Sequence, residues 1–327
     1  MLLIAAPGQG AQAPGFLKEW LELPGISQRL GSWSELAGCD LIRCGTTADA
    51  DEIRDTAIAQ PLLVATAIAV AAELLGGPGR PDGLAGAAAD SGAGAAAGHS
   101  VGELAAGAIA GVIAPADAIR LVRVRAQAMA RAAAAEPTGM TAVLGGDEEA
   151  VLASIEAHGL TPANVNAAGQ IVAAGTMEQL AAFAADPPPK ARLRPLSVAG
   201  AFHTRHMAPA VDALREAAAG VTASDPALAL LSNRDGAVVR GGADWLERIV
   251  TQVSAPVRWD MCMQTMAGLG VSALIELPPA GTLTGLAKRA LPGVRTLALK
   301  SLADLDQARE LLAAGQPLVR VQPNGTD

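Results

Sequence analysis

Gly98-His99-Ser100-Val101-Gly102 is the stretch that decides the fold of this chain. A glycine on each side of Ser100 removes the Cβ atoms that would clash where a strand turns sharply into a helix, so the hydroxyl can stand exposed at the turn. Upstream, the small residues Ala93–Ala97 predict a tightly packed central strand, and downstream Glu103 opens an apolar helical run to Ile113. The stretch therefore predicts a nucleophile elbow; the alternative is a tight turn in a glycine-rich loop.

The composition narrows the class of protein. The apolar share of 51% comes largely from alanine, and the two longest apolar runs, 61–75 and 104–116, are interrupted by Glu73 and Pro115. Neither reaches the roughly 18 uncharged apolar residues of a membrane span. The first six residues lack the basic region of a signal peptide. These observations predict a cytoplasmic protein that does not act at a membrane.

The charge, the aromatic content and the cysteine spacing argue against binding of nucleic acid or of a metal ion. A net charge of -8, an aromatic share of 2% and the absence of tyrosine leave no basic or stacking surface for nucleic acid. Cys39, Cys44 and Cys262 have no metal-site spacing, which favours free thiols in a reducing compartment. We therefore expect neither a nucleic-acid partner nor a bound metal.

The order of predicted elements indicates a small domain inserted in a large one. The pattern is strand, helix, one or two strands, helix, strand over the segments 141–145, 147–158, 164–174, 177–185 and 191–198. This βαββαβ order is typical of a ferredoxin-like unit. The sequence predicts an α/β fold with a large α/β-hydrolase-like catalytic domain that contains a short parallel sheet (1–132 and 199–315), a ferredoxin-like small domain (133–198) and a mobile tail (316–327).

A serine nucleophile needs a base within hydrogen-bond reach. Of the four histidines, His158 lies at a predicted helix end and His99, next to Ser100, faces a different direction. His203 and His206 remain, just after the inserted segment. A histidine there is structural by default, but an elbow serine without any other base makes His203 the candidate.

Two further parts of a serine site have candidates. The backbone N–H of Val101 and one from the glycine loop Pro7-Gly8-Gln9-Gly10 could stabilise an oxyanion; the alternative for that loop is an ordinary strand-ending turn. Arg125 lies 25 residues beyond Ser100, on the predicted helix after the elbow helix. It is one of four arginines there, so it is either a functional cation or a solvated surface residue.

These residues resemble one family along nearly the whole chain. The motifs are PGQGAQ (7–12), Gln60-Pro61, GHSVGE (98–103), Arg125, NVNAAGQIVAAG (164–175), GAFH (200–203) and QVSAPVRW (252–259). They have the order and spacing of malonyl-CoA:acyl carrier protein transacylases, which also carry an inserted ferredoxin-like domain. Two departures are the alanine-rich strand before the elbow and Glu276-Leu277-Pro278-Pro279-Ala280-Gly281, where the glycine that usually follows proline is missing.

The resemblance implies how catalysis is divided among the residues. Ser100 would be acylated, with His203 as general base and acid. The backbone amides of Gln9 and Val101 would form the oxyanion hole. The backbone carbonyl of Gln252, in place of a carboxylate, would orient His203. No metal or redox cofactor is implied.

The resemblance also implies how the substrates bind. Arg125 would bind the free carboxylate of malonyl, Gln60 would be a second substrate-binding residue, and Phe202 would crowd a methyl branch and so favour malonyl over methylmalonyl. The acidic acyl carrier protein would dock on a basic patch, for which Lys288 and Arg289 are candidates. The resemblance thus implies a monomer that transfers malonyl from malonyl-CoA to the phosphopantetheine thiol of acyl carrier protein in fatty acid and, in some pathways, polyketide biosynthesis.

Three alternatives stay open. A discrete acyltransferase of a polyketide synthase could use another acyl-CoA such as methylmalonyl-CoA. A serine thioesterase or hydrolase shares the elbow, but it normally places an Asp or Glu between nucleophile and histidine. A noncatalytic scaffold that binds carrier protein would have no need for Ser100, His203 and Arg125 together.

Overall fold

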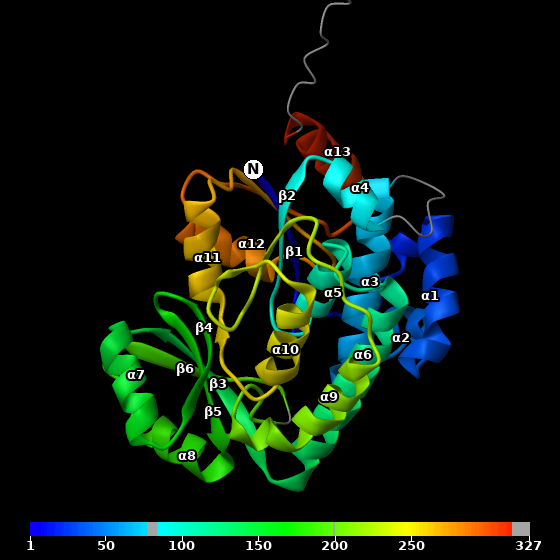
Figure 1. Cartoon of the computed structure of the whole chain (residues 1–327). Coiled ribbons are helices and arrows are strands. Elements are labelled where there is room, and N and C mark those ends of the chain that lie inside the picture. Colours follow the sequence, from blue (N-terminus) through cyan, green and yellow to red (C-terminus); the bar gives the residue numbers. More distant parts are fainter. Residues whose placement is uncertain (77–83, 199, 316–327) are drawn as a thin grey trace, which may run out of the picture.

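The structure, a computed structural model, describes residues 1–76, 84–198 and 200–315, and it is a mixed α/β protein with two separate sheets (Figure 1). The tail predicted over 316–327 lies outside the described residues. The small sheet and its two helices form one end of the molecule, and the large sheet lies among longer helices.

The larger sheet has six strands in the order β11-β10-β1-β2-β7-β8. All neighbours in it run parallel except β8, which is antiparallel to β7. The strands are β1 (Leu2–Ala6), β2 (Ala93–Gly98), β7 (Ala229–Leu231), β8 (Val238–Val239), β10 (Ala273–Glu276) and β11 (Arg295–Ala298). The alanine strand β2 is central, as predicted, so the elbow at its carboxyl end opens at an edge of the sheet where ligands bind in α/β folds.

Alternating side chains of β1 cover two different faces. Leu2 and Ile4 belong to the main hydrophobic core, whereas Leu3 and Ala5 belong to a second cluster on the opposite face. The main core is packed by helices that include α1 (Pro24–Ala37), α2 (Leu41–Thr46), α3 (Thr56–Gly76), α4 (Leu84–Asp90), α5 (Gly102–Ile109), α6 (Pro115–Ala135), α9 (Val211–Ala219), α10 (Gly242–Gln252) and α13 (Ala303–Gly315). Helices α11 (Trp259–Gly268) and α12 (Thr282–Ala290) cover the second face.

The smaller sheet has five strands in the order β6-β3-β5-β4-β9. The inserted segment supplies β3 (Thr138–Gly145), α7 (Glu148–Ala157), β4 (Thr161–Ala167), β5 (Gln170–Thr176), α8 (Met177–Ala185) and β6 (Ala191–Pro195). Their order along the chain is the predicted βαββαβ, and both helices pack on the sheet through residues such as Ile155 and Phe183. The fifth strand, β9 (Val257–Arg258), comes from outside the predicted range 133–198 and pairs in parallel with β4.

Several predicted boundaries shift for local reasons. The elbow helix ends at Ile109, not Ile113, because Gly111 adopts a left-handed φ of 78°. The stretch 164–174 is two strands, separated by a turn in which Gly169 has a φ of 72°. The glycine- and proline-rich connection before β2 contains α4 in its described part.

Helix α3 is the only helix among the described residues that is long and apolar enough to cross a membrane. Within the fold, 89% of its most apolar window is buried, and the helix packs against α6, α1 and α5. Its apolar residues therefore serve the core of this structure.

Candidate active site

The turn between β2 and α5 has the geometry of a nucleophile elbow. A Cβ on Gly98 would overlap the backbone of Gly102, and a Cβ on Gly102 would overlap the carbonyl oxygen of Ala6. Glycine is therefore required at both positions. Ser100 itself has a φ of 52°, a left-handed conformation that a residue with a side chain rarely adopts and that is frequent at functional sites.

His203 lies beside the serine. The Nε2 atom of His203 is 2.7 Å from the Oγ atom of Ser100, and its Nδ1 atom is 3.0 Å from the backbone oxygen of Gln252. Because a carbonyl oxygen only accepts, Nδ1 carries the hydrogen and donates it, which leaves Nε2 to accept from the serine hydroxyl. The loop that holds His203 at a φ of 62° is braced by Thr204, whose Oγ1 donates to the Ala201 oxygen at 2.7 Å.

Arg125 reaches the same point from helix α6. Its Nη2 atom donates to Ser100 Oγ at 3.3 Å, and its Nη1 atom donates to Gln60 Oε1 at 2.6 Å. The side chain is buried, yet none of the ion pairs found within the described ranges includes it. A buried cation normally has a charged partner. The arrangement therefore leaves a guanidinium beside the nucleophile that can pair with an anionic ligand.

Burial sets the charge state of the histidine. The pKa of His203 is lowered from 6.5 to about 3, first because burial disfavours the imidazolium ion and second because the Arg125 cation repels it. Burial also lowers the pKa of Arg125, to about 10, and the buried carboxyl of Glu103 opposes that change. At neutral pH, His203 is therefore a neutral acceptor and Arg125 remains a cation.

This electrostatic coupling predicts the pH dependence of serine acylation. Since only neutral His203 can accept the proton, we expect the acylation rate to stay level as the pH falls through 6.5 and to decline only at lower pH. Arg125→Met removes the repelling cation, so the pKa of His203 rises and the acid limb moves to higher pH. The measurement is the rate of Ser100 sulfonylation by phenylmethanesulfonyl fluoride, a neutral reagent, against pH. Arg123→Met, at an exposed position of the same helix, is the control, and coincident acid limbs for all three proteins would contradict the coupling.

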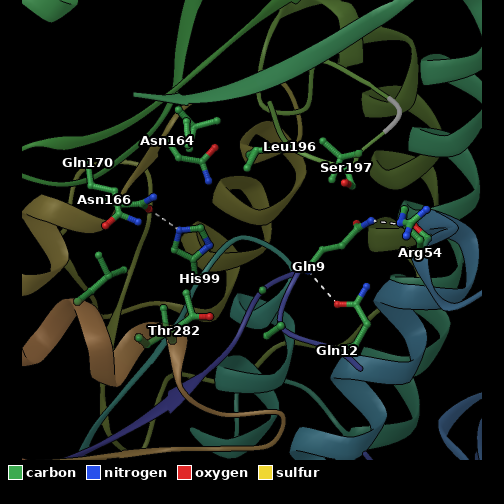
Figure 2. Close-up of a pocket in the computed structure, with 18 of the residues that line it drawn as sticks. Gln9, Gln12, Arg54, His99, Asn164, Asn166, Gln170, Leu196, Ser197 and Thr282 are labelled. Atoms are coloured by element: carbon green, nitrogen blue, oxygen red, sulfur yellow. Dashed lines mark hydrogen bonds between the residues drawn. The ribbon is translucent and has the colours of Figure 1, made fainter. Parts of the chain in front are cut away.

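A cavity of about 420 Å³ lies next to the elbow. Figure 2 shows Gln9, His99 and Asn164 around the same space from three separate segments. The Nε2 atom of His99 pairs with Oδ1 of Asn166 on β4 at 2.8 Å. The Oδ1 atom of Asn164 is buried without a hydrogen-bond partner among the described residues. The cavity therefore offers amide groups to a ligand with polar groups along its length.

The structure brings most of the predicted site residues together. Ser100, His203, Arg125, Gln60 and Gln252 form one connected set of hydrogen bonds. His158 instead lies at the end of α7, where its Nδ1 atom bonds the Ser154 oxygen, and His206 pairs with Glu136.

The remaining predicted residues lie around this set. The backbone N–H groups of Gln9 and Val101 have no hydrogen-bond partner in the described parts of the chain. Phe202 is buried next to His203. Lys288 and Arg289 are exposed at the end of α12, and Arg289 donates to Oε1 of Gln170 at 2.7 Å, a residue that also lines the cavity.

The sequence did not point to two buried residues that lie beside the elbow. Asn233 and Glu103 both contact the elbow segment, and burial raises the pKa of the Glu103 carboxyl to about 8. Asn233 stands in Ser232-Asn233-Arg234-Asp235-Gly236, whose composition predicts only a turn after a strand. Glu103 follows the elbow directly, and a carboxylate in an otherwise apolar helical run is the signal that could have pointed to it.

Within residues 1–76, 84–198 and 200–315, no group of three or more His, Cys, Asp or Glu side chains is placed to hold a metal ion.

Comparisons with known proteins agree on one family. The acyl transferase domain family matches residues 7–307. A protein of Mycobacterium bovis described as malonyl CoA-acyl carrier protein transacylase is 52% identical over 311 residues, which cover 95% of this chain and 100% of that protein.

Two solved structures have a fold similar to that of this chain. The crystal structure of MCAT from Mycobacterium tuberculosis has a TM-score of 0.88 and 52% identity, covering 94% of this chain and 99% of the other. A complex of a type II PKS acyl-carrier protein with its malonyl-transacylase has a TM-score of 0.84 and 28% identity, covering 95% and 99%.

Proposed function

The chain belongs to the acyl transferase domain family, and from that premise we propose that it transfers malonyl from malonyl-CoA to the phosphopantetheine thiol of acyl carrier protein through a malonyl ester of Ser100. The observation that carries the proposal is the buried guanidinium of Arg125, 3.3 Å from the Oγ atom of Ser100. A generic serine hydrolase has no use for a buried cation there, whereas malonyl carries a free carboxylate.

The first half of the reaction forms the ester. His203 Nε2 takes the hydroxyl proton as Ser100 Oγ attacks the thioester carbonyl carbon of malonyl-CoA. The carbon–sulfur bond then breaks, and the leaving CoA sulfur receives the proton from His203. In the second half, His203 takes the proton of the carrier thiol, the sulfur attacks the ester carbonyl, and Ser100 Oγ leaves and regains its proton.

Backbone groups support both halves. The Gln252 carbonyl holds Nδ1–H of His203 and so fixes the tautomer that leaves Nε2 free to accept. The amides of Gln9 and Val101, which are unpartnered among the described residues, are the donors that we assign to the developing oxyanion.

Substrate binding follows from the same geometry. Arg125 would bind the malonyl carboxylate through its two-pronged guanidinium, while the hydrogen bond that its Nη1 atom donates to Gln60 Oε1 keeps the arginine side chain in place. The pantetheine arm, which contains amides and a hydroxyl, would lie in the cavity lined by Asn164 and Gln170. Phe202, buried beside the histidine, would crowd a methyl branch on the α-carbon.

A competition assay tests this function. Given equal amounts of malonyl-CoA, methylmalonyl-CoA and holo carrier protein, we expect malonyl-carrier protein to form about 10- to 200-fold faster than the methylmalonyl product, the range that one methyl group provides. Without carrier protein, we expect one malonyl ester per enzyme and little free malonate. Continuous release of malonate at the full rate would identify a hydrolase, and equal use of both thioesters would refute the role of Phe202.

We describe residues 1–132 and 199–315 as an α/β-hydrolase-like domain and 133–198 as a ferredoxin-like one; the strand order β6-β3-β5-β4 supports the second description. We propose a cytoplasmic monomer that needs no cofactor and docks carrier protein near Lys288 and Arg289. The similarity to a transacylase bound to a polyketide carrier protein keeps a role in polyketide synthesis as the second candidate.

A further inference from the structure

One buried side chain holds the peptide groups on both sides of the elbow. The Oδ1 atom of Asn233 accepts a hydrogen bond from the backbone N–H of Ser100 at 2.6 Å, and its Nδ2 atom donates to the carbonyl oxygen of Gly98 at 2.8 Å. An amide side chain is suited to this task because it carries a donor and an acceptor next to each other. The side chain therefore bridges the last residue of β2 and the nucleophile.

Asn233 is itself buried and is held by hydrogen bonds of its backbone as well as of its side chain. Its exposed fraction is 0%, its backbone N–H donates to Glu103 Oε1 at 2.8 Å, and its carbonyl accepts from the Arg258 amide at 2.8 Å. Its Nδ2 atom also contacts the Sγ atom of Cys262 at 3.7 Å. Because β2 and β7 pair through Ala96 and Leu230, the segment after β7 necessarily lies beside the elbow. The bridge is thus anchored in the central sheet.

The elbow needs such an anchor for two reasons. Ser100 has a left-handed backbone, and a strained conformation persists only where its surroundings hold it. In addition, the N–H of Ser100 lies at the amino end of α5, where an unpaired donor would compete with its neighbours for an oxyanion. The bond to Asn233 occupies this donor and leaves the Val101 amide free.

We infer that Asn233 is a positioning residue, which holds Ser100 in its reactive backbone conformation and keeps the serine amide out of the oxyanion site. This inference rests on the proposed function. Within the described residues, Asn233 forms no hydrogen bond with Arg125 and does not line the cavity, so we expect substrate affinity not to depend on it. Its contribution belongs to the chemical step.

Asn233→Ala removes both bonds to the elbow. We expect the first-order rate of malonyl ester formation, measured by rapid quench at saturating malonyl-CoA, to fall about 10²-fold, the usual result of a small misplacement of a reacting group. The concentration of malonyl-CoA at half-maximal rate is expected to stay within about 2-fold of wild type, because the groups that bind the substrate are unchanged.

A neighbouring variant is the matched control. Cys262→Ala deletes a buried side chain, its bond to the Ser232 oxygen at 3.3 Å and its 3.7 Å contact with Asn233 Nδ2, yet leaves both hydrogen bonds from Asn233 to the elbow. We expect it to lower the melting temperature as Asn233→Ala does, with the rate of ester formation unchanged. A merely structural role for Asn233 predicts wild-type rates per folded molecule in both variants.

A second variant decides the matter if Asn233→Ala does not fold. Asn233→Asp keeps the shape, and its ionised carboxylate still accepts from Ser100 but cannot donate to Gly98. We expect a slower rate than wild type at high pH, with unchanged half-saturation. A wild-type rate for the folded variants, or a loss confined to substrate affinity, would overturn the inference. If the wild-type chain formed no malonyl ester, the proposed function would fail instead.

Discussion

Ser100→Ala is expected to abolish covalent malonylation. When wild-type protein is mixed with malonyl-CoA alone, intact-mass spectrometry should show one added malonyl group, because Ser100 is the hydroxyl within 2.7 Å of the candidate base. His203→Ala keeps the nucleophile but removes the proton acceptor. We expect this variant to form the same ester about 10² to 10⁴ times more slowly, the usual range for a lost general base.

The control for this experiment is His158→Ala. His158 lies at the end of α7, where its Nδ1 atom bonds to the Ser154 oxygen, its Nε2 atom is 4.0 Å from the Asp186 carboxylate and its ring packs edge-on against Phe183. We expect it to leave the rate of ester formation unchanged. A malonyl adduct that persisted in Ser100→Ala would overturn the assignment of the nucleophile and with it the proposed mechanism.

Arg125→Ala is expected to have the second large effect. We expect the loss in kcat/KM for malonyl-CoA to correspond to about 2–5 kcal/mol, the range for truncating one side of a buried charge pair. The rate of transfer from acetyl-CoA is expected to rise relative to the rate from malonyl-CoA, since the acetyl methyl no longer faces an unpaired buried cation. Arg125→Lys should restore little, because an ammonium ion lacks the two parallel donors that match a carboxylate.

The same helix provides the control. Arg123 and Arg125 are two residues apart, about 200° around a helix, so they face nearly opposite directions. The exposed Arg123 donates instead to the backbone oxygen of Glu35, at 3.4 Å. Arg123→Ala is therefore expected to leave the ratio of malonyl to acetyl transfer unchanged. If that ratio moved in Arg123→Ala but not in Arg125→Ala, the carboxylate site would be misassigned.

The sequence by itself determined the elements whose cause is local. Gly98 is required because the backbone of Gly102, four residues further along the chain, leaves no room for a Cβ, and a pattern of two glycines around a serine records that requirement directly. Helix α8 begins and ends where its pattern predicts, with Thr176 and Gln179 closing a capping box at its start. The four-strand order of the inserted segment is local as well, because each strand pairs with elements encoded nearby.

The alternatives that the sequence left open depended on partners far along the chain. The sequence places four arginines on one predicted helix. The packing of α6 against α3 shows that Arg125 is the one buried beside Gln60 and Ser100. The motif 276–281, which lacks the glycine that usually follows proline in the family, contains Glu276, whose carboxylate accepts hydrogen bonds from the backbone amides of Gly281, Leu283 and Thr284 at the start of α12.

Only the tertiary structure identified Asn233 and β9. Asn233 lies 133 residues from Ser100, and its neighbours in the chain read as a plain turn, so no periodicity or spacing marks it. Strand β9 is two residues long and exists because β4 offers an unpaired edge beside it. The steric requirement at Gly98 acts between residues that are close in the chain and is visible in the sequence, whereas a hydrogen bond between distant segments exists only once the sheet has set their register.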